Sequence, residues 1–307
     1  GTFNDSVTLL GNSVKAITVA GNAGLTLTAT STALTSVDAS GITGVTTGGF
    51  SWTSGALAAA STVKGSATGA NVIDVSAATG GAVSYTGGTG NDAVTATNGK
   101  GNTFALGDGT NSVTGSTGNN TVTGGKDADT VIFTTGNNTV NLGNGANAFT
   151  ATTGNNTYTG GTGVDTVTVG GGANVITLGT GADVVSITAA GANVNTYSEI
   201  KDAHAGVSIT FTNQGTETFN ATKVTLANTA VFQDYANAVI QAGGNASVNG
   251  AFGWFNFGGD TYLVQSRHDG SGNNASFVNG TDMVIKLTGL VDLSTATGAG
   301  TATLTLV

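Results

Sequence analysis

Oxygen-bearing side chains recur along the middle of this chain at a fixed spacing. An Asp or Asn stands at twelve positions, and the step between neighbours is nine residues throughout the interval from 102 to 183. The twelve residues are Asp92, Asn102, Asn111, Asn120, Asp129, Asn138, Asn147, Asn156, Asp165, Asn174, Asp183 and Asn193. Carboxylate and carbonyl oxygens are the ligands that Ca²⁺ prefers in proteins. The spacing therefore suggests repeated calcium binding.

Glycines precede these residues in a pattern that would shape a cation site. Residues 87–94 and 160–167 fit the nonapeptide G-G-x-G-x-D-x-U-x, in which U is apolar, nearly letter for letter. Gly permits turns with positive φ that aim several backbone carbonyls at one point, while Asp supplies the charge. A single Gly-Asp or Gly-Asn pair also makes a tight turn without metal. Twelve copies in register favour the calcium interpretation.

Successive nine-residue loops of a roll alternate between its two edges, so the twelve residues divide into two faces. The Asp face carries Asp92, Asn111, Asp129, Asn147, Asp165 and Asp183, and its loops keep Gly at the second motif position. The Asn face carries Asn102, Asn120, Asn138, Asn156, Asn174 and Asn193. We predict calcium on the Asp face. On the Asn face we expect stacked amides that bond to one another and cap the turns without metal.

The predicted calcium ligands all lie in loops of the Asp face. Asp165 and Asp183 form the best-supplied pair, Asp129 comes next with help from Asp127, and Asp108 is expected to assist the loop of Asn111. The full predicted set is Asp92, Gly88, Gly90, Asp108, Asn111, Asp127, Asp129, Gly161, Gly163, Asp165, Gly179, Gly181 and Asp183.

A β-branched or aromatic residue follows two positions after almost every Asp or Asn of the series, and only Asn195 breaks this rule. Such residues fit a buried, pleated surface, so each repeat reads as a loop plus a strand whose apolar residue points inward. One row could not bury that residue, but stacked rows form a continuous core. We predict an all-β fold, with a parallel β-roll or β-helix solenoid over residues 86–195.

The two flanks extend this solenoid. Residues 1–85 read as an irregular β-solenoid segment in which Asn71 and Ile73 occupy the motif places, and Phe50 and Trp52 are expected in the core or a cap. Residues 196–307 read as a C-terminal β-rich cap and secretion-signal region, because the last row of a solenoid must be covered. There we predict one short helix over 229–241 that stops at 243–244, a hairpin of strands 252–257 and 261–264, and strands at 283–287 and 302–307.

Composition excludes several classes of function. The net charge is −9 with only 8 Lys and Arg, which argues against nucleic acid or an anionic membrane as a partner. No Cys is present, so neither a disulfide scaffold nor a thiolate metal site can form. The chain contains neither an H-E-x-x-H motif nor a G-x-S-x-G nucleophile elbow, and its two His residues, His204 and His268, do not form a catalytic motif. The first residue is Gly and no signal peptide follows it, so we expect a piece of a larger protein.

The nonapeptides resemble those of the RTX (repeats-in-toxin) family. Residues 254–264 and 277–291 are similar to the C-terminal ends of RTX-type bacterial surface-layer (S-layer) proteins, and residues 19–40 are similar to the stretch before the roll in the same proteins. The likeness implies export by a type I ABC exporter, Ca²⁺-dependent folding, and self-assembly into a two-dimensional lattice on the cell surface. It also implies that a portion outside this sequence binds cell-surface polysaccharide.

Two other functions fit the same pattern. RTX adhesins share the export route and the calcium requirement. On the Asn face, outward ladders of Thr and Asn resemble flat ice-binding or glycan-binding arrays: Thr117, Thr135 and Thr153 beside Asn119, Asn137 and Asn155. An enzyme is the class that the sequence supports least.

Overall fold

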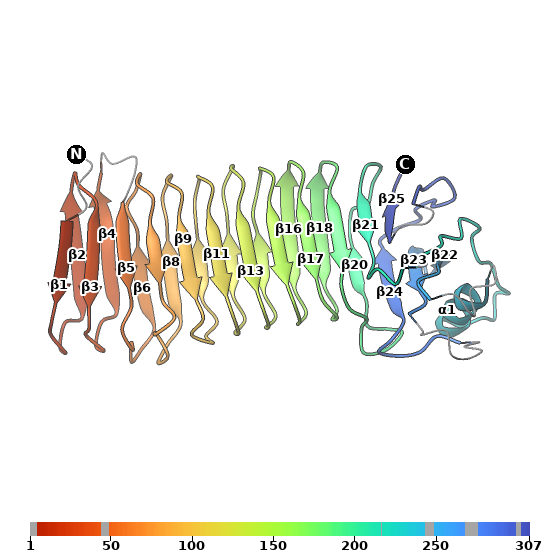
Figure 1. Ribbon diagram of the computed structural model, residues 1–307, viewed down its shortest axis with the longest axis horizontal. Helices are drawn as coiled ribbons and strands as arrows, with labels where there is room; N and C mark the ends of the chain where they lie inside the picture. The colour runs from red at the N-terminus through yellow and green to blue at the C-terminus, as the bar shows by residue number, and fades with distance from the viewer. Residues whose placement is uncertain (1–4, 44–48, 216, 243–248, 268–275, 299–301) are drawn as a thin grey trace. The chain divides into compact units, whose positions relative to one another are not determined.

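A computed structural model describes residues 5–43, 49–215, 217–242, 249–267, 276–298 and 302–307. The chain divides into two compact units, the first comprising residues 1–150 with 160–162 and the second comprising residues 151–159 with 163–307. Both are built mainly from short parallel strands (Figure 1). The predicted all-β parallel solenoid with one short helix near its C-terminus is therefore confirmed.

The first unit is a stack of turns in which odd-numbered strands form one sheet and even-numbered strands form the other. The odd strands are β1 Asp5–Leu9, β3 Leu25–Ala29, β5 Phe50–Thr53, β7 Val72–Asp74, β9 Ala93–Ala96, β11 Ser112–Gly115 and β13 Thr130–Phe133. The even strands are β2 Ala16–Gly21, β4 Ser36–Ile42, β6 Ser61–Lys64, β8 Val83–Thr86, β10 Thr103–Ala105, β12 Thr121–Thr123 and β14 Thr139–Asn141. Two further strands, β15 Ala148–Ala151 and β16 Thr157–Thr162, contain residues of both units.

Strict alternation of buried and exposed residues explains why these segments form strands. In β11 and β13 the exposed Thr or Ser is followed by a buried Val, and Val113 pairs in register with Val94 on one side and Val131 on the other. These three side chains are at most 2% exposed. A one-residue slip would turn every such Val to solvent, so the core itself fixes the register.

The segment before the regular repeats belongs to the same stack. Strands β5, β7 and β9 pair in parallel, as do β4, β6 and β8. Phe50 and Trp52 are 1% and 2% exposed, which confirms the expectation that they are core residues. Ile73 is fully buried and pairs with Val94, as its place in the motif predicted.

The second unit ends the parallel stack with a mixed cap. Parallel strands β17 Thr166–Val169, β19 Val184–Ile187 and β21 Ser208–Thr210 meet the antiparallel strand β25 Thr303–Thr305. On the other sheet, β18 Val175–Thr180, β20 Ser198–Ile200 and β24 Met283–Leu287 are parallel, and the hairpin of β22 Phe252–Phe257 and β23 Asp260–Gln265 adds antiparallel strands. The predicted hairpin and both predicted C-terminal strands are confirmed.

Helix α1 Phe232–Gln241 lies within the predicted range and covers β22 and β23. Its start is fixed by Asp234, whose Oδ2 accepts the N–H of Val231 at 2.9 Å. Val239 and Ile240 pack with Phe255 and Tyr262 in one apolar cluster, so the aromatic residues form a capping core. The predicted stop at Gly243 and Gly244 falls outside the described residues. Within the described part of the chain, no helix combines the length and apolar character that a membrane crossing requires.

Candidate metal-binding face

The side chains of the Asp face link each row of the solenoid to the row before it. Oδ1 of Asn111 accepts the backbone N–H of Asp92 at 2.8 Å, Oδ1 of Asp129 accepts that of Asn111 at 2.9 Å, and Oδ1 of Asn147 accepts that of Asp129 at 2.9 Å. In the second unit, Oδ1 of Asp183 accepts the N–H of Asp165 at 2.7 Å. The predicted sorting of alternate repeats to one face is therefore confirmed by direct bonds between them.

The Asn residues of this face use their second terminal atom, the amide nitrogen Nδ2, to bond to carbonyls of their own loops. Nδ2 of Asn111 donates to the carbonyl of Gly109 at 2.8 Å and lies 3.3 Å from that of Gly107. Nδ2 of Asn147 donates in the same way to the carbonyls of Gly145 at 3.1 Å and Gly143 at 3.0 Å. The amide N–H groups thus lie among the loop carbonyls, where a cation would otherwise be the natural partner.

The Asp residues cannot close their loops in this way, because a carboxylate oxygen accepts hydrogen bonds and does not donate them. Asp129 and Asp183 are fully buried, and their Oδ2 atoms have no hydrogen-bond partner among the described residues. A buried carboxylate oxygen without a partner is costly. The donor set of carboxylate oxygens and nearby loop carbonyls therefore fits Ca²⁺, whose charge would satisfy both.

Glycine at the first motif position makes room for the carboxylate. A Cβ at Gly124 would lie only 2.1 Å from Oδ2 of Asp129, and one at Gly87 would lie 2.1 Å from Oδ2 of Asp92. Leu106 and Leu142 take this position in the rows of Asn111 and Asn147, and both are fully buried. The choice between Gly and Leu thus follows the choice between Asp and Asn in these four rows, whereas the row of Asp183 has the buried Leu178 at this position.

The predicted glycines of the Asp face pack directly on the backbone of the preceding row. A Cβ at Gly88, Gly90, Gly161 or Gly181 would lie 1.8–2.5 Å from a backbone oxygen of that row. Gly163 donates its N–H to the carbonyl of Thr180 at 3.0 Å. Such close approach stacks the loop carbonyls in register, as a cation site built from backbone oxygens requires.

Asp92, which is also a predicted ligand, already has a partner for each oxygen. Its Oδ2 accepts the hydroxyl proton of Tyr85 at 2.7 Å, and its Oδ1 accepts both N–H groups of Asn71, at 2.9 Å from the backbone and 2.7 Å from Nδ2. Burial raises the pKa of Asp92 to about 6, although these bonds oppose the shift. Burial likewise raises the pKa of Asp129, which the Asn111 amide partly offsets. Sequence reasoning missed Tyr85, because nothing in the nonapeptide period marks it.

Asp108 and Asp127 lie on the outer side of the same loops. Asp108 forms an ion pair with Lys126 of the following row, and both side chains are substantially exposed. The Lys126 ammonium holds the pKa of Asp108 below its usual value. Oδ2 of Asp127 accepts the N–H of Gly109 at 2.9 Å. Both carboxylates therefore tie neighbouring loops together from outside.

The Asp face ends at two residues that sequence reasoning did not assign to it. The carboxylate of Asp202 accepts the N–H groups of Leu178 at 2.9 Å and Gly179 at 2.8 Å. The His204 ring places Nδ1 at 2.8 Å from the Asp202 carbonyl and Nε2 at 3.0 Å from the Gly181 carbonyl. The contact with the Asp202 carbonyl is the main cause that raises the pKa of His204 above its usual value. A ring protonated on both nitrogens donates to both carbonyls and closes this end of the face.

The Asn face forms the expected amide ladder. Oδ1 of Asn120 accepts the N–H of Asn102 at 3.1 Å, and Oδ1 of Asn138 accepts that of Asn120 at 3.0 Å. Nδ2 of each of these three residues donates to the carbonyl two residues earlier, at 3.0–3.1 Å. In the second unit, Asn174 accepts the N–H of Asn156 at 3.0 Å. Each of these amides is thus bonded within the protein.

The assignment of Asn193 to this ladder was wrong. Asn193 makes a local turn instead, in which its Oδ1 accepts the N–H of Asn195 at 2.9 Å. Ser198 takes the expected place, because Nδ2 of Asn174 donates to its hydroxyl at 3.0 Å and Val175 pairs with Glu199. The extra residues of the turn shift the register, and the core position falls to Ile200.

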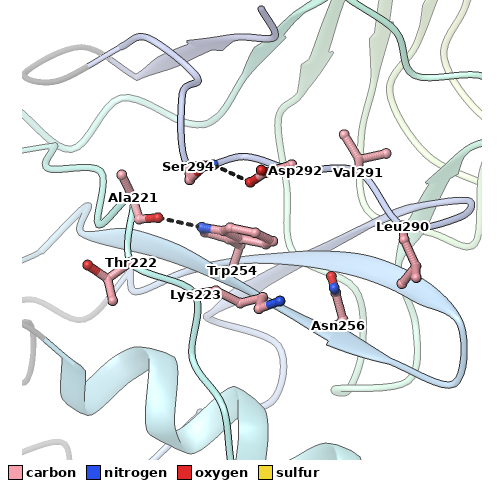
Figure 2. Close-up of a pocket in the computed structure, with 9 residues that line it drawn as sticks. All are labelled: Ala221, Thr222, Lys223, Trp254, Asn256, Leu290, Val291, Asp292 and Ser294. Carbon is pink, nitrogen blue, oxygen red and sulfur yellow. Dashed lines mark hydrogen bonds between the residues drawn. The ribbon is translucent and has the colours of Figure 1, made fainter.

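A separate pocket of about 600 Å³ lies in the second unit beside Trp254 (Figure 2). The indole Nε1 donates to the carbonyl of Ala221 at 3.0 Å, and the Lys223 ammonium lies 5.6 Å from the ring centroid. Asp292 accepts the N–H of Ser294 at 2.9 Å at the opposite rim. Trp254 is only 3% exposed, so it offers packing and a cation–π contact rather than an open aromatic surface.

Among the described residues, no three His, Asp or Glu side chains gather closely enough to hold a metal ion by themselves.

Comparison with known proteins gives a family match in the region of the Asp face. Residues 106–140 and 150–185 match the family model of the RTX calcium-binding nonapeptide repeat. No curated protein matches the chain. Repeats of this family bind Ca²⁺ in a β-roll, and the matched residues form such a roll here. Residues 106–140 and 150–185 thus match the RTX calcium-binding nonapeptide repeat in sequence, and they lie in the parallel β-roll that such repeats form.

Proposed function

We propose that this chain is a structural surface-layer protein that leaves the cell by type I secretion, folds on binding extracellular Ca²⁺ and assembles with its own copies into a two-dimensional lattice. The observation that carries the calcium dependence is the pair of buried Oδ2 atoms of Asp129 and Asp183, which have no hydrogen-bond partner among the described residues. A protein that depends on these sites would fold where calcium is abundant.

The ion concentrations inside and outside a cell support this role. Extracellular calcium modules bind with dissociation constants of roughly 10⁻⁴ to 10⁻³ M, so such sites stay empty in the cytoplasm. Empty, the buried carboxylates disfavour the folded state and keep the chain competent for export. Outside, calcium that binds only the folded chain shifts the equilibrium toward it.

The lattice part of the proposal is supported by the resemblance of residues 254–264 and 277–291 to the C-terminal ends of RTX-type surface-layer proteins. The net charge of −9 adds a physical reason for calcium at subunit contacts, because acidic surfaces repel unless a cation joins them. We propose no catalytic role, and we expect the exporter and copies of the chain itself as partners. A portion outside this sequence would bind polysaccharide at the cell surface.

Electron microscopy tests the proposal against the adhesin alternative. The purified chain in millimolar Ca²⁺ should form ordered two-dimensional arrays that dissolve in EGTA and return when calcium is restored. Mg²⁺ at the same concentration should not restore them, because it is smaller and demands octahedral geometry. Folded but dispersed monomers under all calcium conditions would overturn the lattice assignment and favour an adhesin. Binding to ice or glycans that is lost on Thr135→Ala would favour the ladder of Thr and Asn instead.

A further inference from the structure

The side chain at the sixth position of each Asp-face loop has two terminal atoms, and only the first of them plays the same role in Asp and in Asn. The first terminal atom, Oδ1, accepts an N–H from the preceding row whether the residue is Asp129 or Asn111. The second terminal atom is either a carboxylate oxygen or an amide N–H. The two residue types have nearly the same shape, so they differ here in hydrogen-bonding polarity and charge.

The amide solution is the same in six loops, whereas Nδ2 of Asn174 donates to the Gly170 carbonyl and the Ser198 hydroxyl instead. On the Asp face, Nδ2 of Asn111 and Asn147 donates to the carbonyl two residues earlier at 2.8 Å and 3.1 Å. On the Asn face the same bond is found at 3.0–3.2 Å, from Asn102 to Lys100, Asn120 to Gly118, Asn138 to Gly136 and Asn156 to Gly154. An Asn loop therefore carries its own donor for the carbonyl that would otherwise ligate a cation.

Tyr85 provides a third solution at Asp92. Its hydroxyl donates to Oδ2 of Asp92 at 2.7 Å, and Tyr85 is fully buried. The carboxylate of Asp92 is thus satisfied by protein donors, whereas the Oδ2 atoms of Asp129 and Asp183 lack a hydrogen-bond partner among the described residues. These rows are of three kinds. In the rows of Asn111 and Asn147 an amide nitrogen donates to a loop carbonyl, in the row of Asp92 a carboxylate oxygen accepts a hydroxyl proton, and in the rows of Asp129 and Asp183 a carboxylate oxygen has no hydrogen-bond partner among the described residues.

We infer that this second terminal atom selects which rows hold metal. The rows of Asp129 and Asp183 bind Ca²⁺, an amide takes the place of the ion in the rows of Asn111 and Asn147, and the Tyr85 hydroxyl takes its place at Asp92. The inference rests on the proposed calcium-dependent folding and makes it specific. The Asp face would then hold fewer ions than its count of Asp and Asn loops suggests. Its metal-free rows would stay closed when calcium is removed.

Asp129→Asn and Asp183→Asn test the selection in the full chain, with bound Ca²⁺ counted by elemental analysis and calorimetric titration. Each variant should lose one ion. Its melting temperature in EGTA should equal or exceed that of the wild type, because the new amide can donate to the loop, while its gain on adding calcium should shrink by several degrees. Asp38→Asn is the matched control, since Asp38 is partly exposed and bonds to Lys64 and Ser40; it should keep every ion.

Tyr85→Phe tests the third solution. Without the hydroxyl, Oδ2 of Asp92 loses its hydrogen-bond partner and resembles Oδ2 of Asp129. The melting temperature of this variant in EGTA should therefore be lower than that of the wild type, and calcium should raise it by more. An unchanged calcium response in Tyr85→Phe, or a full complement of ions in both Asp→Asn variants, would overturn the selection while leaving calcium-dependent folding intact. A wild-type chain that binds no calcium would instead overturn the proposed function itself.

Discussion

The Asp face and the Asn face of the roll show how one backbone frame can be closed with or without metal. On both faces, Oδ1 of the sixth loop residue accepts an N–H from the row before, at 2.8–3.1 Å in the first unit. They differ in the second terminal atom of the side chain, which is an amide nitrogen in the Asn102, Asn120 and Asn138 loops and is either an amide nitrogen or a carboxylate oxygen on the Asp face. The difference teaches that calcium dependence resides in single atoms and not in the β-roll frame.

Calcium removal should produce the largest effect, and it should destabilise the loops of the Asp face more than those of the Asn face. In EGTA the melting temperature should fall strongly, since each site filled at a hundred times its dissociation constant contributes about 2.7 kcal/mol to stability. Hydrogen exchange should show early loss of protection in the loops of Asp129 and Asp183, while the amides of Asn102 and Asn120 stay protected. An unchanged melting temperature after exhaustive chelation would remove the distinction between the faces.

The pH dependence of the calcium-free protein should come next. Because burial raises the pKa of Asp92 from 3.8 to about 6, the folded state binds more protons than the unfolded state between these values. The contribution of Asp92 to stability is therefore present below pH 3.8 and declines as the pH rises to about 6, by about 3 kcal/mol. Asp129 should add to this trend in the same direction.

Urea unfolding between pH 4 and 7 on protein freed of calcium measures this effect, with Asp92→Asn as the control that lacks the carboxyl group. The stability difference between wild type and Asp92→Asn should change with pH in favour of the variant as the pH rises. A difference that stays constant across this range would contradict the buried, proton-binding carboxyl group.

On the Asn face, Asn120→Ala should cost about 2 kcal/mol whether or not calcium is present. The variant leaves the buried N–H of Asn102 and the carbonyl of Gly118 without their partner. Asn119→Ala is the matched control one residue earlier, because Asn119 is exposed and its Oδ1 accepts one surface N–H, from Asn137. If calcium restored the stability of Asn120→Ala, the Asn face would not be independent of metal.

The smallest effect should follow from Lys126→Ala. It removes the exposed ion pair with Asp108 on the outer side of the Asp face, and solvent and salt screen such pairs. Both the melting temperature and the number of bound calcium ions should stay close to those of the wild type. A lost ion would place Asp108 among the ligands and extend the metal site to the outer side of the loops.

Much of the fold followed from the nonapeptide period, because core position, strand and loop repeat together. Even the degenerate row of Asn71 and Ile73 was predicted correctly: Asn71 accepts the N–H groups of Ser66 and Phe50 at 2.7 Å and 3.2 Å, and Ile73 is buried. The period fails where residues are inserted, as at Asn193, since a local turn can absorb the motif residue without any change in composition.

The nonapeptide period could not predict which groups bond to individual carboxylates. The hydroxyl of Tyr85, in the strand directly before the loop, reaches Asp92 seven residues later, a contact that depends on side-chain length and packing. Asp202 and His204 belong to a loop that lacks the nonapeptide pattern, yet they close the end of the Asp face through three backbone groups: the N–H groups of Leu178 and Gly179 and the carbonyl of Gly181. A short pattern predicts where an oxygen stands but not which donor meets it.

The bonds from Oδ1 give the stack a direction. Each side chain covers a backbone N–H of the row that precedes it, as Asn120 does for Asn102 and Asp183 does for Asp165. Removing rows from the N-terminal end would uncover side-chain oxygens, whereas removing rows from the C-terminal end would uncover buried N–H groups, which are rarely tolerated without a partner. Truncation from the N-terminal end should therefore be better tolerated than truncation from the C-terminal end.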